Sequence, residues 1–187
     1  TEISKVIWGK GIPGTYGDVH MATRDGRILG FGGELEPYNG RDCNGSVTFA
    51  SLNIYSNQLT VNLIEKPHPS WVGECRPFCF ISDLGKSGSV FFYEFRNDGG
   101  QGTWIYDIQE NKFNKLNPSK EPKGLPNTVV YIPDQKAVFA IINNEHQWIY
   151  SFEKQTWGEI PLKGSGEVQF MRPYAQTVYS EKYGVLV

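Results

Sequence analysis

A strand–turn–strand pattern recurs three times along the chain, and it constrains the fold more than any other feature. The copies are TFASLNIYSNQLTVNL, GTWIYDIQENKFNKL and QWIYSFEKQTWGEIPL. In each copy a large apolar residue closes the first strand, and another follows five positions later. These pairs are Ile54 and Leu59, Ile108 and Phe113, and Phe152 and Trp157, so the copies lie 108 − 54 = 54 and 152 − 108 = 44 residues apart. Self-similarity at such a period indicates a repeat architecture.

A second set of hairpins accompanies the first set. ATRDGRILGF, VYIPDQKAVFA and VYSEKYGVLV hold Asp25, Asp134 and Glu181 in their turns, and FCFISDLGKSGSVFFYEF fits between the first two with a longer turn. Two hairpins per unit give four strands per unit. The predicted units are 12–64, 74–117, 126–162 and a partial unit at 171–187.

The patterning predicts an all-β chain. No segment carries an apolar period of 3.6 over the ten or more positions that a helix needs, and 21 glycines and 11 prolines interrupt the sequence. Four antiparallel strands per unit is the plan of a propeller blade. We therefore expect a β-propeller of four-stranded antiparallel blades, with about three complete blades and further partial ones in this chain.

Composition narrows the functional classes. The 187 residues are 39% hydrophobic, which is enough for the core of one domain, predicted to span 1–187. With 18 basic and 20 acidic residues and no dense basic run, nucleic acid is a poor partner. No apolar stretch is long enough for a membrane helix, and TEISKVIWGKGIPG lacks the pattern of a signal peptide. We expect no membrane partner, and we favour an extracellular or periplasmic location.

The three cysteines do not predict a metal or redox site. Cys75 and Cys79 are four residues apart, which separates their sulfurs by about 13 Å on an extended strand, too far for a disulfide. CRPFC lacks the two-residue spacing of a zinc or redox pair. One bridge from Cys43 is the most that the set allows within one chain, and we expect buried or free thiols.

The order of strand, GFGG, long loop and ASLNIYSNQL resembles a kelch repeat, with its diglycine closing the second strand and a tryptophan opening the fourth. The resemblance extends over essentially the whole chain and is degenerate. The diglycine is in place only at Gly32 and Gly33, and the tryptophan only at Trp157. The second unit has its glycines displaced into a loop at 99–100, and the third has Asn143 and Asn144 instead.

The repeat count predicts that this chain is part of a larger propeller. A closed propeller has about four to eight blades, whereas three units are complete here and the fourth starts at PYAQTVYSEKYGVLV. We expect the remaining blades to come from missing polypeptide or from a partner chain. SKVIWGK would then be the outer strand of another blade. A four-bladed ring closed by this strand is the alternative, and it needs one more strand than the sequence offers.

One recurrence suggests a ligand site. CRPFCF and MRPYAQ place Arg-Pro-aromatic before the first strand of a unit, and 172 − 76 = 96 is two repeats. The matching segment of the first unit is TYGDVHMA. In a kelch-like propeller the first strand of each blade is innermost, so the resemblance implies that these segments surround the mouth of the central channel. The candidate ligand-binding residues are Tyr16, Asp18, His20, Arg76, Phe78, Arg172 and Tyr174.

Arginines beside aromatic rings suit a carboxylate-bearing or sugar-like ligand. The alternative is structural, with proline opening an inner strand and arginine capping a turn. Loops 36–46 and 65–74 carry further exposed aromatics that suit a partner. His20, His68 and His146 share no metal-binding spacing, and we expect no metal or cofactor.

Two functions fit these residues. The first is a binding module that holds a protein or a glycan at the channel mouth and loops. The second is a carbohydrate-active enzyme such as a polysaccharide lyase. In that enzyme Arg76 or Arg172 would neutralise a uronate carboxylate, and His20 or Tyr16 would transfer the proton. We favour binding, because the sequence places no acid/base pair at reacting distance.

Overall fold

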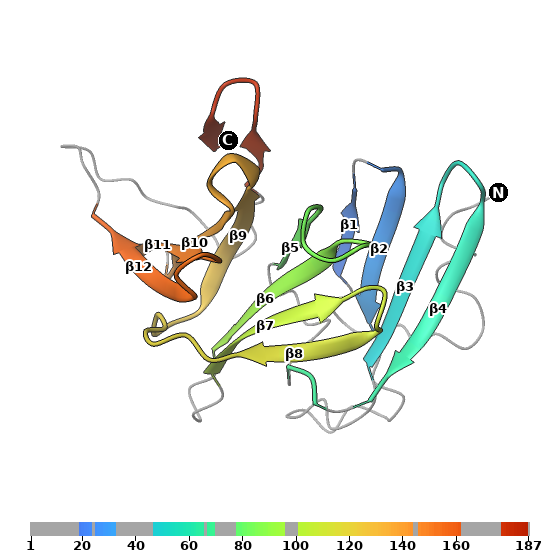
Figure 1. Cartoon of the computed structure of the whole chain (residues 1–187), viewed down its shortest axis with the longest axis horizontal. Helices are drawn as coiled ribbons and strands as arrows, with labels where there is room; N and C mark the ends of the chain where they lie inside the picture. The colour runs from blue at the N-terminus through green and yellow to red at the C-terminus, as the bar shows by residue number, and fades with distance from the viewer. Residues whose placement is uncertain are drawn as a thin grey trace. The chain divides into compact units, whose positions relative to one another are not determined.

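The chain is almost entirely extended. The computed structural model describes residues 19–23, 25–32, 47–65, 67–69, 78–95, 101–143, 146–161 and 177–186. These residues form β-strands and turns, with a single 3₁₀ turn, η1, at Pro133–Gln135 (Figure 1). None of the described segments is a helix long and apolar enough to cross a membrane. The predicted all-β fold class is confirmed.

Within the described residues, three four-stranded antiparallel sheets follow one another along the chain, each in the strand order of the sequence. The first sheet contains β1 (Val19–Ala22), β2 (Arg27–Gly32), β3 (Val47–Asn53) and β4 (Gln58–Ile64). The second contains β5 (Phe78–Ile81), β6 (Ser89–Phe95), β7 (Gln101–Asp107) and β8 (Lys112–Leu116). The third contains β9 (Pro126–Ile132), β10 (Ala137–Ile142), β11 (His146–Ser151) and β12 (Thr156–Ile160). A two-stranded ribbon of β13 (Tyr179–Ser180) and β14 (Val185–Leu186) completes the described fold.

The three sheets and the ribbon match the predicted fold class of three complete four-stranded repeats and a partial fourth repeat. The chain forms two compact units: residues 1–76 with 110–114, and residues 77–109 with 115–187. The first sheet lies in the first of these units, and the third sheet and the ribbon lie in the second. Residues 110–114, which include the start of β8, belong to the first unit.

The turn between the third and fourth strands is built in the same way in all three sheets. The residue that ends the third strand uses its side-chain oxygen to accept a hydrogen bond from a backbone N–H of the turn. Asn53 Oδ1 accepts from Tyr55 and Ser56 at 3.0 Å each, Asp107 Oδ1 from Gln109 at 2.8 Å, and Ser151 Oγ from Lys154 at 3.2 Å. Asn, Asp and Ser favour such turns because their short side chains reach the backbone two or three residues ahead.

The last residue of each of these turns is left-handed. Asn57, Asn111 and Gln155 have φ angles of 54°, 53° and 49°. They are spaced 111 − 57 = 54 and 155 − 111 = 44 residues apart, the same intervals that the apolar pairs show. The sequence repeat is therefore a backbone repeat.

The repeat also holds for the large side chains. Trp104 and Trp148 both lie three residues before the residue that caps the turn, in the third strand of their sheets. Trp104 is opposite Phe92 in the second strand, and Trp148 is opposite Ala140. The two tryptophans occupy equivalent places, as the repeat predicts.

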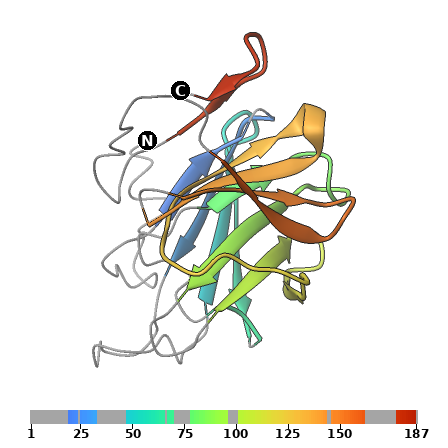
Figure 2. The same ribbon diagram turned by 90° about the vertical axis from the view of Figure 1, so that its left-hand side faces the viewer.

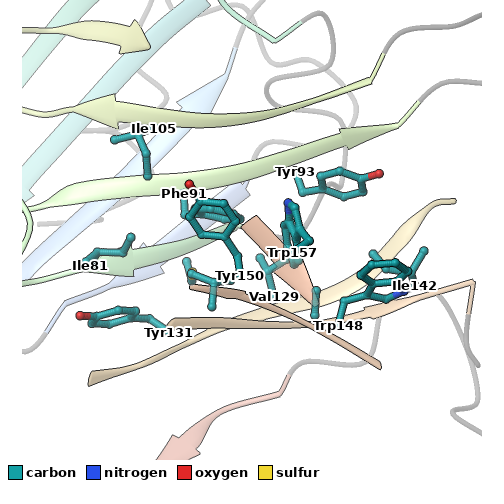
Figure 3. Packing of buried hydrophobic residues seen from close by; sticks show 13 residues of the cluster. Ile81, Phe91, Tyr93, Ile105, Val129, Tyr131, Ile142, Trp148, Tyr150 and Trp157 are labelled. Atoms are coloured by element: carbon teal, nitrogen blue, oxygen red, sulfur yellow. The ribbon is translucent and has the colours of Figure 1, made fainter. Parts of the chain in front are cut away.

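The second and third sheets pack together around a cluster of aromatic rings (Figure 3). Trp157 is 1% exposed, and its ring centroid lies 5.4 Å from that of Tyr93, 5.5 Å from Tyr150 and 5.8 Å from Phe91. The first strands of the two sheets, β5 and β9, lie next to each other in this unit. Large aromatic side chains bury much apolar area and fill the space between two twisted sheets, so they dominate such interfaces.

The first unit has its own smaller aromatic core. Phe31 and Phe49 lie opposite each other on β2 and β3, with ring centroids 5.0 Å apart. Phe113 joins them at 6.0 Å from Phe31, and the buried ring of His68 lies 6.5 Å from Phe113.

A buried polar relay joins the two sheets of the second unit to the connection between them. The indole N–H of Trp157 donates to Thr103 Oγ1 at 2.9 Å, and the Thr103 hydroxyl donates to Glu121 Oε1 at 2.7 Å. The same connection is held at Pro122, whose carbonyl accepts from the Tyr93 hydroxyl and from Gln101 Nε2. Since a buried indole N–H needs an acceptor, this relay orients Trp157 as it packs.

Thr103→Val is expected to lower the free energy of unfolding by about 1–3 kcal/mol, because it leaves the buried N–H of Trp157 without its acceptor. The control is Thr60→Val on an exposed position of β4, which should change the free energy by less than about 0.5 kcal/mol. Urea unfolding followed by tryptophan fluorescence measures both. Equal stabilities of the two variants would contradict this role of the relay.

Candidate functional site

Most of the predicted ligand-binding residues lie outside the described residues. These are Tyr16, Asp18, Arg76, Arg172 and Tyr174, and the candidate loop at 36–46 lies there as well. Of the loop at 65–74 only residues 65 and 67–69 are described. The assignment of these positions to a ligand site stays a prediction, and so do the catalytic roles considered for Arg76, Arg172 and Tyr16.

His20 and Phe78 are in described strands, at equivalent places. His20 lies opposite Gly30 in β2, and Phe78 lies opposite Phe92 in β6. The Phe78 side chain is buried, with its ring centroid 5.3 Å from that of Phe92. At this position the Phe78 side chain packs within the fold.

The two ends of the first sheet differ in the length of their connections. Because strands alternate in direction, the connections from β1 to β2 and from β3 to β4 lie at one end, which we call the turn end. The connections from β2 to β3 and from β4 to the next sheet lie at the other end, the loop end. Residues 23–26 and 54–57 make the two four-residue turns of the first sheet, whereas its loop-end connections are the fourteen residues 33–46 and the thirteen residues 65–77.

The later sheets are less regular, because the loop end also has connections of five residues (96–100), nine residues (117–125) and three residues (143–145), and the turn end has one of seven residues (82–88). The eighteen residues 161–178 connect β12 to β13 at the loop end, whereas residues 152–155 make a four-residue turn at the turn end. In the sequence Tyr16, Asp18 and Arg76 come one to three residues before the first strand of a sheet, and His20 and Phe78 lie at its start, whereas Arg172 and Tyr174 come seven and five residues before β13. Long connections held by a rigid scaffold are where binding residues concentrate.

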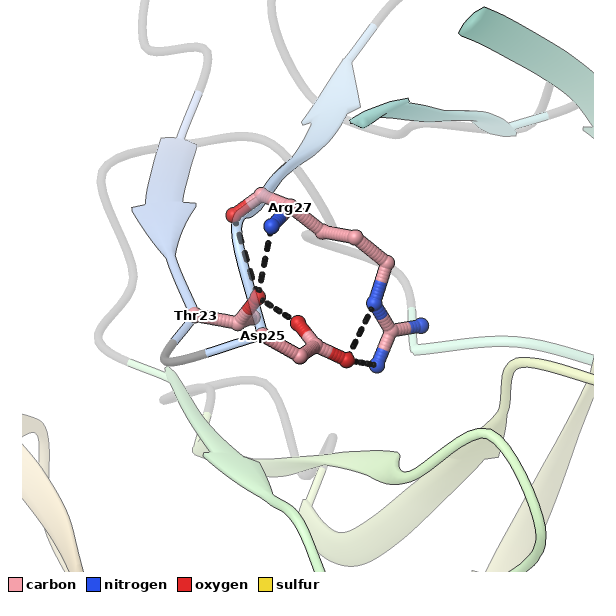
Figure 4. A network of polar contacts seen from close by, with 3 residues as sticks. All are labelled: Thr23, Asp25 and Arg27. Carbon is pink, nitrogen blue, oxygen red and sulfur yellow. Dashed lines mark hydrogen bonds and ion pairs between the residues drawn. The ribbon is translucent and has the colours of Figure 1, made fainter. Parts of the chain in front are cut away.

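The turn end of the first sheet carries a closed polar network (Figure 4). Arg27 donates from Nε to Asp25 Oδ2 at 2.8 Å, and its Nη2 lies 2.6 Å from the same oxygen. The Thr23 hydroxyl donates to the other carboxylate oxygen of Asp25. Hydrogen bonds from the Arg27 side chain are the main reason that the pKa of Asp25 lies below its usual value. This arginine is already engaged within its own turn.

An exposed aromatic ring stands beside that network. The Tyr55 side chain is 79% exposed, and its ring lies over Gly26, where a Cβ atom would meet Tyr55 Cε2 at 2.1 Å. Gly26 has a φ of 78°, a conformation that favours glycine, so both the turn and the tyrosine require it. Tyr55 is therefore held in place at the surface by the backbone beneath it.

A tyrosine–aspartate hydrogen bond recurs at the turn end of the second unit. The Tyr131 hydroxyl in β9 donates to Asp83 Oδ1 in the preceding sheet at 2.5 Å. The Tyr179 hydroxyl in β13 donates to Asp134 Oδ2 at 3.3 Å, which fixes the ribbon beside the β9–β10 hairpin (Figure 2). Tyr131 is opposite Val138 and Tyr179 is opposite Leu186, so the two tyrosines hold equivalent positions.

These two tyrosine–aspartate hydrogen bonds were not predicted from the sequence, although a sequence pattern accompanies them. VYIPD and VYSEK both place Val-Tyr shortly before the acidic residue of the first turn. The acidic residue that each tyrosine contacts belongs to the preceding sheet, 131 − 83 = 48 and 179 − 134 = 45 residues earlier. Only the strand register reveals that pairing.

Other reactive groups of the described residues are occupied or buried. Burial raises the pKa of the Cys79 thiol, which disfavours the reactive thiolate. His68 Nδ1 lies 2.8 Å from the Pro69 carbonyl, and His146 Nδ1 lies 3.0 Å from Glu159. No group of three or more His, Cys, Asp and Glu side chains within the described segments is placed to hold a metal ion.

No family model and no curated protein matches this chain. The function of the site therefore has to be inferred from its own residues. The fold itself defines an all-β protein of successive four-stranded antiparallel sheets, consistent with propeller-like blades.

Tyr131→Phe is expected to lower the free energy of unfolding by about 0.5–1.5 kcal/mol, because one hydrogen bond to a charged acceptor is lost while Asp83 regains water. The matched control is Tyr55→Phe, whose hydroxyl is at the surface, and it should change stability by less than about 0.5 kcal/mol. Chemical unfolding at pH 7 compares them. The link would be unimportant if the two variants were equally stable.

The same residue gives a pH dependence. Burial, and next the hydrogen bond to Asp83, raise the pKa of Tyr131 in the folded chain. The folded state then holds the Tyr131 proton more tightly than the unfolded state. The contribution of this hydroxyl to the free energy of unfolding is therefore full below pH about 10 and is lost as the pH rises above that value. The stability difference between the wild type and Tyr131→Phe should therefore shrink between about pH 10 and pH 11.5. A constant difference would contradict this assignment.

Proposed function

We propose that this chain is a kelch-like binding module whose ligand site lies at the loop end of its sheets. The observation that carries this proposal is that the three longest connections between described strands, of fourteen, thirteen and eighteen residues, all join strand ends at the loop end. The kelch-like pattern of GFGG and of Trp157 supports the class. Within that class, further blades from additional polypeptide or a partner chain would complete the ring.

The chemistry of the loop end favours an anionic ligand. Arg76 and Arg172 each stand before a proline and an aromatic residue, two residues ahead of β5 and seven residues ahead of β13. A guanidinium group pairs with a carboxylate through two parallel hydrogen bonds, and neighbouring aromatic rings stack on sugars or on peptide side chains. We propose a ligand that bears carboxylates, either a uronate-containing glycan or an acidic protein segment.

Packing within the second unit supports a common site. The first strands β5 and β9 lie side by side. Arg76 leads into β5, and Phe78, at the start of β5, forms the aromatic pair with Phe92. This arrangement would place several short segments around one ligand, as propeller-like folds do.

Arg172→Ala is expected to weaken binding of a uronate oligosaccharide or an acidic peptide by tenfold or more, because a charge-assisted pair contributes about 1.5–3 kcal/mol. The control is Arg27→Ala, whose guanidinium is paired with Asp25 at the opposite, turn end, and which should leave binding unchanged. Calorimetric titration gives the affinities and thermal unfolding gives the stabilities. If Arg172→Ala binds normally and melts several degrees lower, the arginine serves the fold and the proposal fails.

A further inference from the structure

The outer strand of the first sheet differs from the outer strands of the other two sheets in its charge. β4 is the last strand in the order of its sheet, and among the described strands it pairs only with β3. Its seven residues, QLTVNLI, contain no charged residue, no proline and no glycine. The outer strand β8 carries Lys112 and Lys115, and the outer strand β12 carries Glu159. Charged side chains on an edge strand prevent pairing with another chain, so β8 and β12 are protected and β4 is not.

β4 also exposes apolar side chains along one face. Leu59, Val61 and Leu63 share this face, because they are opposite Leu52, Ala50 and Thr48 of β3 in turn. Val61 is 45% exposed and Leu63 is 50% exposed. An uncharged strand edge with accessible aliphatic side chains is a template for another strand.

The sequence of β4 is symmetric in polarity about Val61. Leu-Thr-Val-Asn-Leu, residues 59–63, runs apolar, polar, apolar, polar, apolar. If two copies of β4 pair antiparallel about a two-fold axis at Val61, Val61 faces itself, and Leu59 faces Leu63 of the second copy. On the opposite face Thr60 meets Asn62. Apolar and polar residues then each meet their own kind across the axis, and cross-strand pairs of matched character stabilise a sheet.

From this symmetry we infer that β4 is a homodimerisation edge, where two copies of the chain join their first sheets into one eight-stranded antiparallel sheet. A two-fold interface places the residue at the axis opposite its own copy and pairs the other residues reciprocally, so like charges along the edge would come close together, and β4 carries no charge. This inference goes beyond the proposed ligand site, which lies in the connections and not on the strand edge.

One contact within the chain must yield for the pairing to extend along the whole strand. Asn111 Nδ2 donates to the Leu63 carbonyl at 3.1 Å. That carbonyl would accept from the backbone N–H of Leu59 of the second copy in the two-fold register. The side-chain bond is a replaceable partner for the carbonyl, since a backbone donor satisfies the same oxygen. Asn111→Ala is therefore expected to preserve or strengthen the dimer.

The test uses the full chain in sedimentation equilibrium between about 10 and 500 µM, a range that detects micromolar to submillimolar dissociation constants. The wild type should show a monomer–dimer equilibrium. Val61→Lys and Val61→Glu should each raise the dissociation constant about tenfold or more, because like charges then meet at the axis. A 1:1 mixture of the two variants should form a heterodimer, because the introduced ammonium group of one copy then faces the introduced carboxylate of the other.

Circular dichroism and thermal unfolding are used to check that both variants fold. We expect them to fold, because Lys115 of β8 is already a lysine on an outer strand. A wild type that stays monomeric over the whole concentration range overturns the inference. So do charge variants that dimerise as the wild type does. Loss of the dimer in both variants without rescue in the mixture overturns the two-fold register at Val61. Weaker dimerisation of Asn111→Ala would show that this contact supports the edge and does not compete for it.

Discussion

Burial of Trp157 between the second and third sheets is the interaction on which the second unit depends. An aromatic side chain of this size removes about 150–250 Å² from water, which at about 25 cal/mol per Å² stabilises the fold by roughly 4–6 kcal/mol. The hydrogen bond from its indole N–H to Thr103 adds less, but it fixes which way the ring faces. Apolar burial thus supplies the stability of this interface, and the relay through Thr103 and Glu121 supplies its orientation.

The turn end and the loop end of the sheets serve different purposes. At the turn end, side chains close on their own backbone: Asn53 caps its turn, Arg27 pairs with Asp25, and Tyr131 reaches Asp83 of the preceding sheet. These contacts consume the polar groups that a ligand would need. At the loop end the connections between described strands vary from three to eighteen residues. A rigid end and a variable end on the same strands are what a recognition scaffold requires.

The strands could be predicted from sequence because local rules determine them. The turn between β3 and β4 follows from Asn53 and Asn57, whose side chains favour that geometry wherever the sheet lies. The same holds for Asp107 and Asn111 in the next unit. The link from Tyr131 to Asp83 could not be predicted in this way, since it depends on how one sheet packs on another. The repeat singles out Arg76 and Arg172 in the sequence, but a period of about 48 residues does not say where their side chains lie.

The order of the strands has a consequence for synthesis. Each sheet is complete within one stretch of chain, so the second sheet can form as soon as its last strand leaves the ribosome. Its partner comes later, because Trp157 follows Phe91 by 157 − 91 = 66 residues. At about 5–20 residues per second, the aromatic face around Phe91 waits roughly 3–13 s for its cover. During that interval the nascent chain presents an apolar surface that a chaperone would recognise, and the arrival of Trp157 ends its exposure.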